Sequence, residues 1–173
     1  MRRKIIIGAI AVTTIIIGII YYLRADRALP PDIIVDGILV LKSERKLILI
    51  KDGKQIKRYR ISLGPNPIGH KTQEGDGKTP EGRYTIDYRN PRSKYHLSMH
   101  ISYPNKADRA QAKRRRISPG GDIMIHGLPN GLEEIGGFQR CTDWTQGCIA
   151  VTDEEIDELW RAVPNGAPIE IRP

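Results

Sequence analysis

The sequence predicts a mainly β domain with one helix near its C-terminus, preceded by an N-terminal transmembrane helix, and three observations support this prediction. Short apolar runs rich in Ile and Val alternate with turns, and 17 Gly and 12 Pro are spread along the 173 residues. One late segment combines helical periodicity with a capping pattern. An uncharged stretch near the N-terminus stands apart from both patterns. Two cysteines exclude a disulfide-rich scaffold and a four-cysteine zinc site.

The uncharged stretch, residues 5–23, predicts an N-terminal transmembrane helix that precedes the domain. As a helix it would span roughly 28 Å, close to the hydrocarbon thickness of a bilayer. Residues 1–4 form a basic end that is expected to stay in the cytoplasm, and residues 24–32 form a short linker. A cleaved signal peptide and a buried soluble helix are the alternatives, but the apolar run is long for a signal peptide and no good cleavage site follows it.

From residue 33 onward, apolar runs bounded by turn residues predict the strands. Lys51-Asp52-Gly53-Lys54 has the composition of a hairpin turn. Residues 64–82 contain several Gly and Pro and little apolar material, which predicts a long loop of the kind that often carries function. The expected strands are 33–35, 38–41, 46–50, 55–63, 83–88, 96–103, 123–125, 149–152 and 168–171.

The predicted helix begins after Thr152 and ends before residues 164–166, Pro-Asn-Gly. Thr152 and Glu155 form a Thr-x-x-Glu capping box, and acidic residues in the first turn suit the helix dipole. Its apolar face, spaced as on a helix, consists of Ile156, Leu159, Trp160 and Val163. Trp160 is therefore expected to serve packing.

The net charge of +8 is unevenly spread, because residues 1–28 alone contribute +4 and the rest of the chain contributes the other +4, which leaves a mildly basic domain. Within the domain, residues 106–116 are strongly basic and predict a solvated loop or short helix. Nucleic-acid contact is not expected, since no aromatic residues interleave with these charges for base stacking. Attraction to an anionic wall polymer or to lipid headgroups is the other reading.

The chemistry-bearing residues lie between His126 and Thr152. His126-Gly127 closes a predicted strand, and Thr145-Gln146-Gly147-Cys148 precedes another. A cysteine directly after glycine can be held in a tight turn with its sulfur exposed, and a nearby histidine can take the thiol proton and return it to a leaving amine. The thiolate is the nucleophile, so such a cysteine needs a base at neutral pH.

These segments resemble the L,D-transpeptidase catalytic domain (YkuD domain). Its signature is His-Gly, a spacer, and then Ser/Thr-His-Gly-Cys, which His126-Gly127 and residues 145–148 follow. Upstream, residues 61–64 (Ile-Ser-Leu-Gly) and 75–84 (Gly-Asp-Gly-Lys-Thr-Pro-Glu-Gly-Arg-Tyr) match the family's Gly-x-Thr-Pro-x-Gly-x-Tyr region. The resemblance implies a β-sandwich of mixed sheets with the helix packed outside, for a catalytic domain covering residues 33–173.

The resemblance also implies an activity. Cys148 would be the nucleophile and His126 the general base and acid, with backbone groups of Gly147 and Cys148 in the oxyanion hole. The substrate would be a peptidoglycan stem tetrapeptide, attacked at the diamino-acid carbonyl with release of D-alanine and transfer to an amine. No metal or organic cofactor would be needed. Together with the anchor, this implies a single-pass protein of the bacterial inner membrane with its catalytic domain in the periplasm or on the outer side.

Two departures keep alternatives open. Gln146 stands where the family usually has a second histidine, and Ala150 stands where many members have Arg or Asn. Hydrolysis of the same bonds, as an L,D-carboxypeptidase or endopeptidase, and an inactive wall-binding module are the alternatives. The acceptor can be a stem peptide, a protein lysine, a free D-amino acid or water.

Further residues are candidates for the site. Trp144 is expected as a cleft wall or as core, Arg140 as a contact for substrate carboxylates or a solvated side chain, and His70 as a residue of the cleft. Cys141 is either a structural bystander or the partner of Cys148 in a disulfide. The complete set of predicted substrate and oxyanion residues is Gly147, Gln146, Thr145, Gly127, Trp144, Arg140 and His70.

Overall fold

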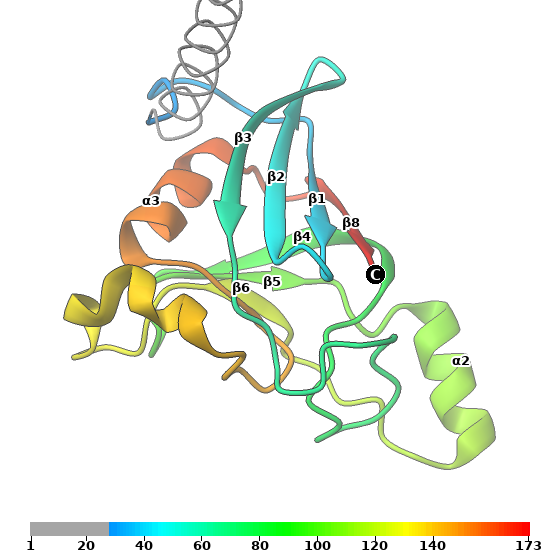
Figure 1. Ribbon diagram of the computed structural model, residues 1–173. Coiled ribbons are helices and arrows are strands. Elements are labelled where there is room, and N and C mark those ends of the chain that lie inside the picture. The colour runs from blue at the N-terminus through cyan, green and yellow to red at the C-terminus, as the bar shows by residue number, and fades with distance from the viewer. Residues whose placement is uncertain (1–27) are drawn as a thin grey trace, which may run out of the picture. The chain divides into compact units, whose positions relative to one another are not determined.

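The computed structural model describes residues 28–173, whose eight strands form one curled, mixed sheet (Figure 1). The strand order is β3-β2-β1-β8-β4-β5-β6-β7, and only the pairs β1–β8 and β6–β7 are parallel. The elements are β1 (Gly37–Leu41), β2 (Lys46–Lys51), β3 (Lys54–Arg60), β4 (Gly82–Asn90), β5 (Ser98–Ile101), α2 (Lys106–Arg115), β6 (Met124–His126), η1 (Glu133–Cys141), β7 (Ile149–Ala150), α3 (Asp153–Ala162) and β8 (Pro168–Arg172).

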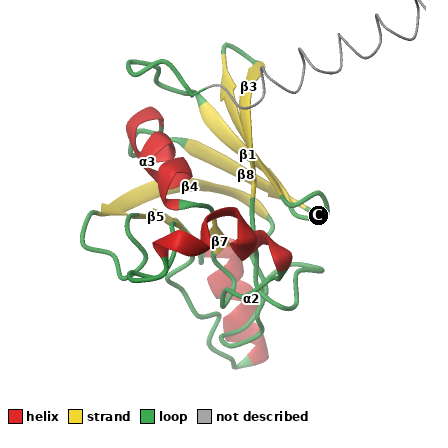
Figure 2. Ribbon diagram, turned by 60° about the vertical axis from the view of Figure 1, so that its left-hand side comes forward, coloured by secondary structure: helices red, strands yellow, loops and turns green. Residues whose placement is uncertain are grey.

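Strand β4 joins the two halves of the sheet. Its residues 82–85 pair with β8, its residues 86–90 pair with β5, and the register shifts between Ile86 and Tyr88. An irregularity of this kind bends and twists a strand, so the two halves curl around a shared core (Figure 2). The mainly β, mixed prediction is confirmed. The expected sandwich takes the form of a single curled sheet, because β4 is nine residues long and runs through both halves.

Helix α3 forms where the sequence predicts it. Thr152 and Glu155 exchange both hydrogen bonds of the capping box. Ile156 and Leu159 are fully buried against the sheet. Trp160 is half-buried and stacks under the guanidinium of Arg89, which lies 4.0 Å from the ring centroid. The packing role predicted for Trp160 is confirmed.

Three parts of the chain differ from the prediction of a mainly β domain with one helix. Residues 33–35 form no strand, because the N–H of buried Val35 donates to the carbonyl of Ala162 at the end of α3 (2.9 Å) and not to a neighbouring strand. The basic segment forms helix α2, which decides between the predicted loop and short helix. The short 3₁₀ segment η1, ahead of the cysteine motif, was not predicted.

The long loop between β3 and β4 is held by the buried ammonium group of Lys42. This side chain is 2% exposed and donates to the carbonyls of Gly69 (2.7 Å) and Thr79 (3.1 Å) and to the carboxylate of Glu81 (2.7 Å). Burial lowers the pKa of Lys42, and the Glu81 carboxylate counteracts that effect. One charged group, directly after β1, thus joins the middle of the loop to the end of the loop that leads into β4.

A second charged group organises the tip of the same loop. The Asp76 carboxylate accepts from the backbone N–H groups of Thr72, Gln73 and Lys78 and from the ammonium of Lys71. Burial acts to raise the pKa of Asp76, but these four donors outweigh it and the pKa is lowered. The carboxylate therefore stays charged and fixes the loop against itself.

The loop packs directly on the turn that carries the cysteine. A Cβ atom on Gly64 would lie 2.2 Å from the Gly77 carbonyl oxygen and 2.9 Å from the Gly147 nitrogen, so only glycine allows this approach. The Thr79 hydroxyl donates to the Gly147 carbonyl (2.9 Å). The position of the loop consequently decides the position of the site.

Among residues 28–173, no helix has the length and apolar composition that crossing a membrane requires. The predicted span, residues 5–23, and the basic end before it lie outside the described residues.

We predict that Lys42→Met lowers the free energy of unfolding by about 3 kcal/mol, because it leaves the part-buried Glu81 carboxylate and two carbonyls without their donor. Urea denaturation monitored by tryptophan fluorescence measures this change. Lys46→Met is the matched control, since Lys46 pairs with Glu44 at the surface, and its effect should stay below about 0.5 kcal/mol. Equal effects of the two substitutions would contradict the role of Lys42.

Candidate active site

Cys148 sits at the end of a tight turn that leads into β7. Gly147 has φ +110°, and a Cβ atom there would lie 2.4 Å from the Lys78 carbonyl oxygen, so the turn requires glycine. The Thr145 hydroxyl closes the turn by accepting from the Gly147 N–H (3.2 Å) and donating to the Cys148 carbonyl (2.8 Å). The motif residues therefore present the thiol at the start of β7.

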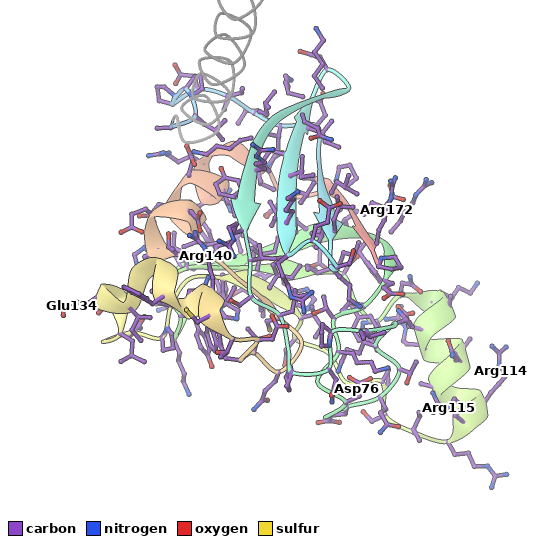
Figure 3. All side chains as sticks on the ribbon, in the orientation of Figure 1. Asp76, Arg114, Arg115, Glu134, Arg140 and Arg172 are labelled. Carbon is purple, nitrogen blue, oxygen red and sulfur yellow. The ribbon has the colours of Figure 1, made fainter. Side chains whose placement is uncertain are left out.

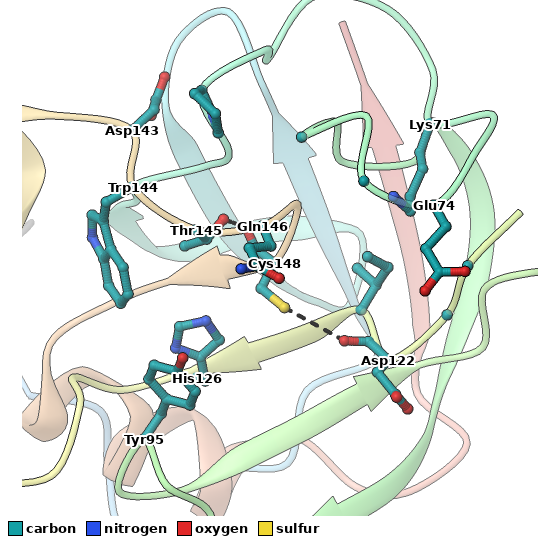
Figure 4. Close-up of a pocket in the computed structure, with 16 residues that line it drawn as sticks. Lys71, Glu74, Tyr95, Asp122, His126, Asp143, Trp144, Thr145, Gln146 and Cys148 are labelled. Carbon is teal, nitrogen blue, oxygen red and sulfur yellow. Dashed lines mark hydrogen bonds between the residues drawn. The ribbon is translucent and has the colours of Figure 1, made fainter.

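The Cys148 thiol lies against strand β6 and the residues before it. Its Sγ accepts from the Met124 N–H (3.4 Å) and donates to the Asp122 carbonyl (3.5 Å; Figure 4). Burial raises the pKa of the thiol above its ordinary value, and this outweighs the Met124 N–H and the Lys71 charge, which act to lower it. At neutral pH the side chain is a thiol.

His126 is the last residue of β6 and is 3% exposed. Because β6 and β7 are parallel with His126 opposite Ala150, His126 and Cys148 point to the same face of neighbouring strands. Figure 4 shows the ring beside the cysteine side chain. Nδ1 lies 2.7 Å from the Gly127 carbonyl oxygen. Since a carbonyl only accepts, the proton of the neutral ring is on Nδ1, and Nε2 can accept a proton from the thiol.

Aromatic side chains enclose the imidazole. The Tyr95 ring lies 4.5 Å and the Trp144 ring 5.6 Å from the His126 ring, centroid to centroid. The indole N–H of Trp144 donates to the Gln139 side chain (2.9 Å), which fixes the wall that the indole forms. This burial lowers the pKa of His126 from 6.5 to about 4, although the Gly127 carbonyl acts to raise it. The histidine is therefore neutral at physiological pH.

The cysteine and the histidine share a pocket of about 880 Å³. Tyr95, Trp144 and His126 form its aromatic part, and Lys71, Glu74 and Asp122 contribute charged groups (Figure 4). The lining consists of Pro65, Lys71, Glu74, Gly75, Gly77, Tyr95, Gly120, Gly121, Asp122, Ile123, His126, Asp143, Trp144, Thr145, Gln146 and Cys148. Within the described part of the chain, no three His, Cys, Asp or Glu side chains gather as a metal site would require.

Of the predicted site residues, Cys148, His126, Thr145, Gln146 and Trp144 line this pocket. Gly147 lies buried in the turn behind the thiol.

Gly127, Arg140 and His70 lie outside the pocket lining. The guanidinium of Arg140 is bonded to Glu155 (2.6 Å) and the Arg60 carbonyl, and the His70 ring is bonded to Asp108 and the Glu81 N–H. The geometry thus assigns both side chains to the scaffold.

Cys141 is exposed and both cysteines are free, so the alternative of a Cys141–Cys148 disulfide is not realised.

Five lining residues with polar or aromatic side chains were not predicted: Lys71, Glu74, Tyr95, Asp122 and Asp143. Asp143 is paired with Arg45 (2.6 Å). Lys71 and Glu74 belong to the long loop, whose length and composition were the available signal. Tyr95 and Asp122 have no comparable signal, because their places depend on the chain segments that flank β5 and β6.

Comparison with known proteins gives consistent matches. The model of the L,D-transpeptidase catalytic domain (YkuD) matches residues 32–171. YafK of Escherichia coli strain K12 is 33% identical over 132 residues, which are 73% of this chain and 46% of YafK. The chain therefore spans about half the length of the curated relatives it matches.

Solved structures agree with the family match. The helical cell shape determining protein Pgp2 of Campylobacter jejuni is 26% identical with a TM-score of 0.63, over 82% of this chain and 48% of Pgp2. Bd1075 of Bdellovibrio bacteriovorus is 27% identical with a TM-score of 0.56, over 84% of this chain and 54% of Bd1075. An Enterococcus faecium L,D-transpeptidase, 18% identical with a TM-score of 0.53 over 81% of this chain and 50% of its own, shares the fold.

The buried His126 predicts a specific pH dependence of stability. Its pKa is about 4 when folded against 6.5 as the ordinary value. Between these pH values the unfolded chain binds more protons than the folded one, so stability falls as pH falls. Over this window wild type should lose about 3 kcal/mol more than His126→Gln in the free energy of unfolding. Urea denaturation at pH 7 and pH 4 measures both. A parallel loss in the two proteins would mean that His126 titrates normally.

Proposed function

The chain belongs to the L,D-transpeptidase catalytic domain family, and we propose that it is a cysteine-dependent peptidoglycan L,D-transpeptidase. Its donor is the stem tetrapeptide, which acylates Cys148 at the diamino-acid carbonyl and releases D-alanine. The observation that carries this proposal is the meeting of a free thiol and an unprotonated imidazole nitrogen in one pocket. The thioester is then transferred to an amine.

In this mechanism the thiol is activated only when it reacts. Burial raises the pKa of Cys148 and lowers that of His126, so the resting pair is neutral and no thiolate–imidazolium pair forms beforehand. As Sγ attacks the carbonyl carbon, its proton moves to Nε2 of His126. The C–N bond then breaks, the imidazolium returns that proton to the leaving amine of D-alanine, and the S–C bond of the thioester remains.

The second half repeats the proton transfers in reverse order. An acceptor amine attacks the thioester carbonyl and gives a proton to Nε2. The C–S bond breaks, and the proton returns to the departing sulfur, which restores the thiol. The Gly147 N–H is already donated to the Thr145 hydroxyl, so in this proposal the Cys148 N–H is the principal backbone donor to the oxyanion.

Substrate charge is matched by the unpredicted lining residues. Among the described residues that line the pocket, Lys71 is the one Lys or Arg. It is 3% exposed and held by Asp76 (2.9 Å) and the Gln73 carbonyl (3.1 Å). In this proposal Lys71, and not Arg140, contacts a carboxylate of the stem peptide. Glu74 and Asp122 contact amino groups of the substrate.

Hydrolysis of the thioester is the second candidate function, and Gln146 is the observation that favours it. Gln146 lines the pocket beside Cys148, so a second titratable histidine is missing there. Water is small enough to be activated by His126 alone, whereas a protonated amine must also lose its charge before it attacks. Carboxypeptidase or endopeptidase activity would use the same acylation step.

We further propose that the enzyme works on the outer side of the bacterial inner membrane, anchored by residues 5–23, and that it contributes to cell shape. The apolar composition of that segment supports the first part. The similarity to the cell shape determining protein Pgp2 supports the second.

We predict that Cys148→Ala abolishes acylation and slows D-alanine release from a tetrapeptide by about 10³-fold or more, because the nucleophile is lost. Acid-quenched intact-mass spectrometry should show the acyl adduct on wild type and on Cys141→Ser, the matched control that removes the other free thiol. D-alanine release by Cys148→Ala at the wild-type rate would end the proposal, and the inactive wall-binding alternative would follow if wild type also released none.

We also predict that Gln146→His accelerates acylation by up to about tenfold, equivalent to about 1.4 kcal/mol, because a charged donor stabilises the oxyanion better than an amide. Single-turnover acylation by a tetrapeptide between pH 6 and 8 measures this rate, with Gln146→Asn as the neutral control. If Gln146→His is acylated more slowly than wild type at every pH, Gln146 does not stand in for a histidine in transpeptidation, and hydrolysis becomes the better proposal.

A further inference from the structure

Helix α2 holds the positive charge of the domain. Residues 28–173 contain 23 Lys and Arg against 19 Asp and Glu, a net charge of +4. Residues 106–116 alone have six basic residues and one acid, a net charge of +5, so the remainder is slightly negative. All six basic side chains are exposed: Lys106, Arg109, Lys113, Arg114, Arg115 and Arg116. We call these six the basic cluster.

The fold makes little use of these charges, and of the six side chains Arg109 donates to the Pro104 carbonyl. The helix is attached through buried Asp108, which accepts from the Tyr84 hydroxyl (3.1 Å) and the Asn105 N–H (2.9 Å), and through buried Ala112. No member of the basic cluster takes part in an ion pair within residues 28–173. Figure 3 shows Arg114 projecting away from the body of the domain.

Helix stability explains only part of the cluster. The cations in the last turn, Lys113 to Arg115, interact favourably with the negative end of the helix dipole, which stabilises the helix by about 0.3–1 kcal/mol for each charge. Lys106 and Arg109 lie in the first half of the helix, where the dipole disfavours a cation. Six cations within eleven residues also repel one another. A polyanionic partner removes this repulsion.

The chain connects the basic cluster directly to the catalytic pocket. The chain that leaves α2 supplies Gly120, Gly121, Asp122 and Ile123 to the pocket lining. Ser118, just after the helix, accepts from the Glu74 N–H (2.9 Å) through its carbonyl and donates to the Glu74 carboxylate (2.9 Å) through its hydroxyl. A pocket of about 880 Å³ holds a few amino acid residues, so a polymeric substrate must extend past its rim.

We infer that the basic cluster of α2 is an electrostatic docking surface for the peptidoglycan polymer. It binds the carboxylates of stem peptides next to the one that enters the pocket. This inference rests on the proposed function, which supplies the polymer as substrate. Several weak carboxylate contacts along one polymer raise its local concentration at the pocket and make binding sensitive to salt. Because the segment that follows α2 lines the pocket, the polymer is favoured over a membrane surface as the partner.

Binding is tested apart from catalysis with the full chain carrying Cys148→Ala. Co-sedimentation with purified sacculi compares this protein with the added substitutions Lys113→Gln/Arg114→Gln/Arg115→Gln. The triple variant should bind about tenfold more weakly at about 50 mM salt and lose most of its salt dependence. The control is Lys54→Gln/Arg83→Gln/Arg92→Gln, which removes three exposed cations elsewhere and should bind as the parent does. Equal binding by both triples would overturn the inference.

Activity gives the second readout, with Cys148 intact. The α2 triple should be acylated by a soluble tetrapeptide at the wild-type rate but release D-alanine from sacculi about tenfold more slowly. Failure of the proposed function looks different, because wild type itself would then not be acylated by the soluble donor. Lys106→Gln/Arg109→Gln relieves repulsion at the helix start and tests the same surface if the triple does not fold. Loss of binding to phosphatidylglycerol vesicles with unchanged binding to sacculi would overturn the inference in favour of a membrane.

Discussion

The buried ammonium group of Lys42 is the interaction on which the site depends. The loop between β3 and β4 has almost no strand structure of its own, yet it forms one wall of the pocket and packs on the cysteine turn. Lys42, directly after β1, ties the middle of the loop to its C-terminal end, and Asp76 orders the tip through four donors. Buried charges are costly to form but costlier to leave unpaired, so these two groups hold the loop in one conformation.

Burial also decides how the reactive pair behaves at rest. The aromatic wall that positions His126 removes it from water and lowers its pKa, while the same enclosure raises the pKa of Cys148. Both shifts favour the uncharged forms, so in the proposed mechanism the thiol loses its proton only as it attacks a carbonyl. The Gly127 carbonyl, by holding the proton on Nδ1, leaves Nε2 ready as the base. The site therefore holds a neutral thiol and a neutral imidazole in one pocket and not a thiolate–imidazolium ion pair.

Charge is segregated in this domain. The basic cluster stands on α2, whereas the pocket carries Glu74 and Asp122, and its Lys71 is neutralised by Asp76. A substrate that bears both carboxylates and amines can contact both regions along one polymer. Because the segment that follows α2 lines the pocket, one polymer that reaches both regions is what the proposed docking requires.

The sequence by itself determined the local features: the capping box of α3, the hairpin turn at Asp52-Gly53 and the glycine-held turn at Cys148, and it singled out Cys148 and His126 as candidate site residues that both line the pocket. Each depends on residues close in the chain or on a motif with a fixed chemical meaning. Only the tertiary structure decided that β4 joins both halves of one sheet and that Arg140 pairs with Glu155 away from the pocket. It also placed Lys71, Tyr95 and Asp122 around the thiol, because strand pairing and loop closure bring together residues whose separation in sequence carries no signal of their contact.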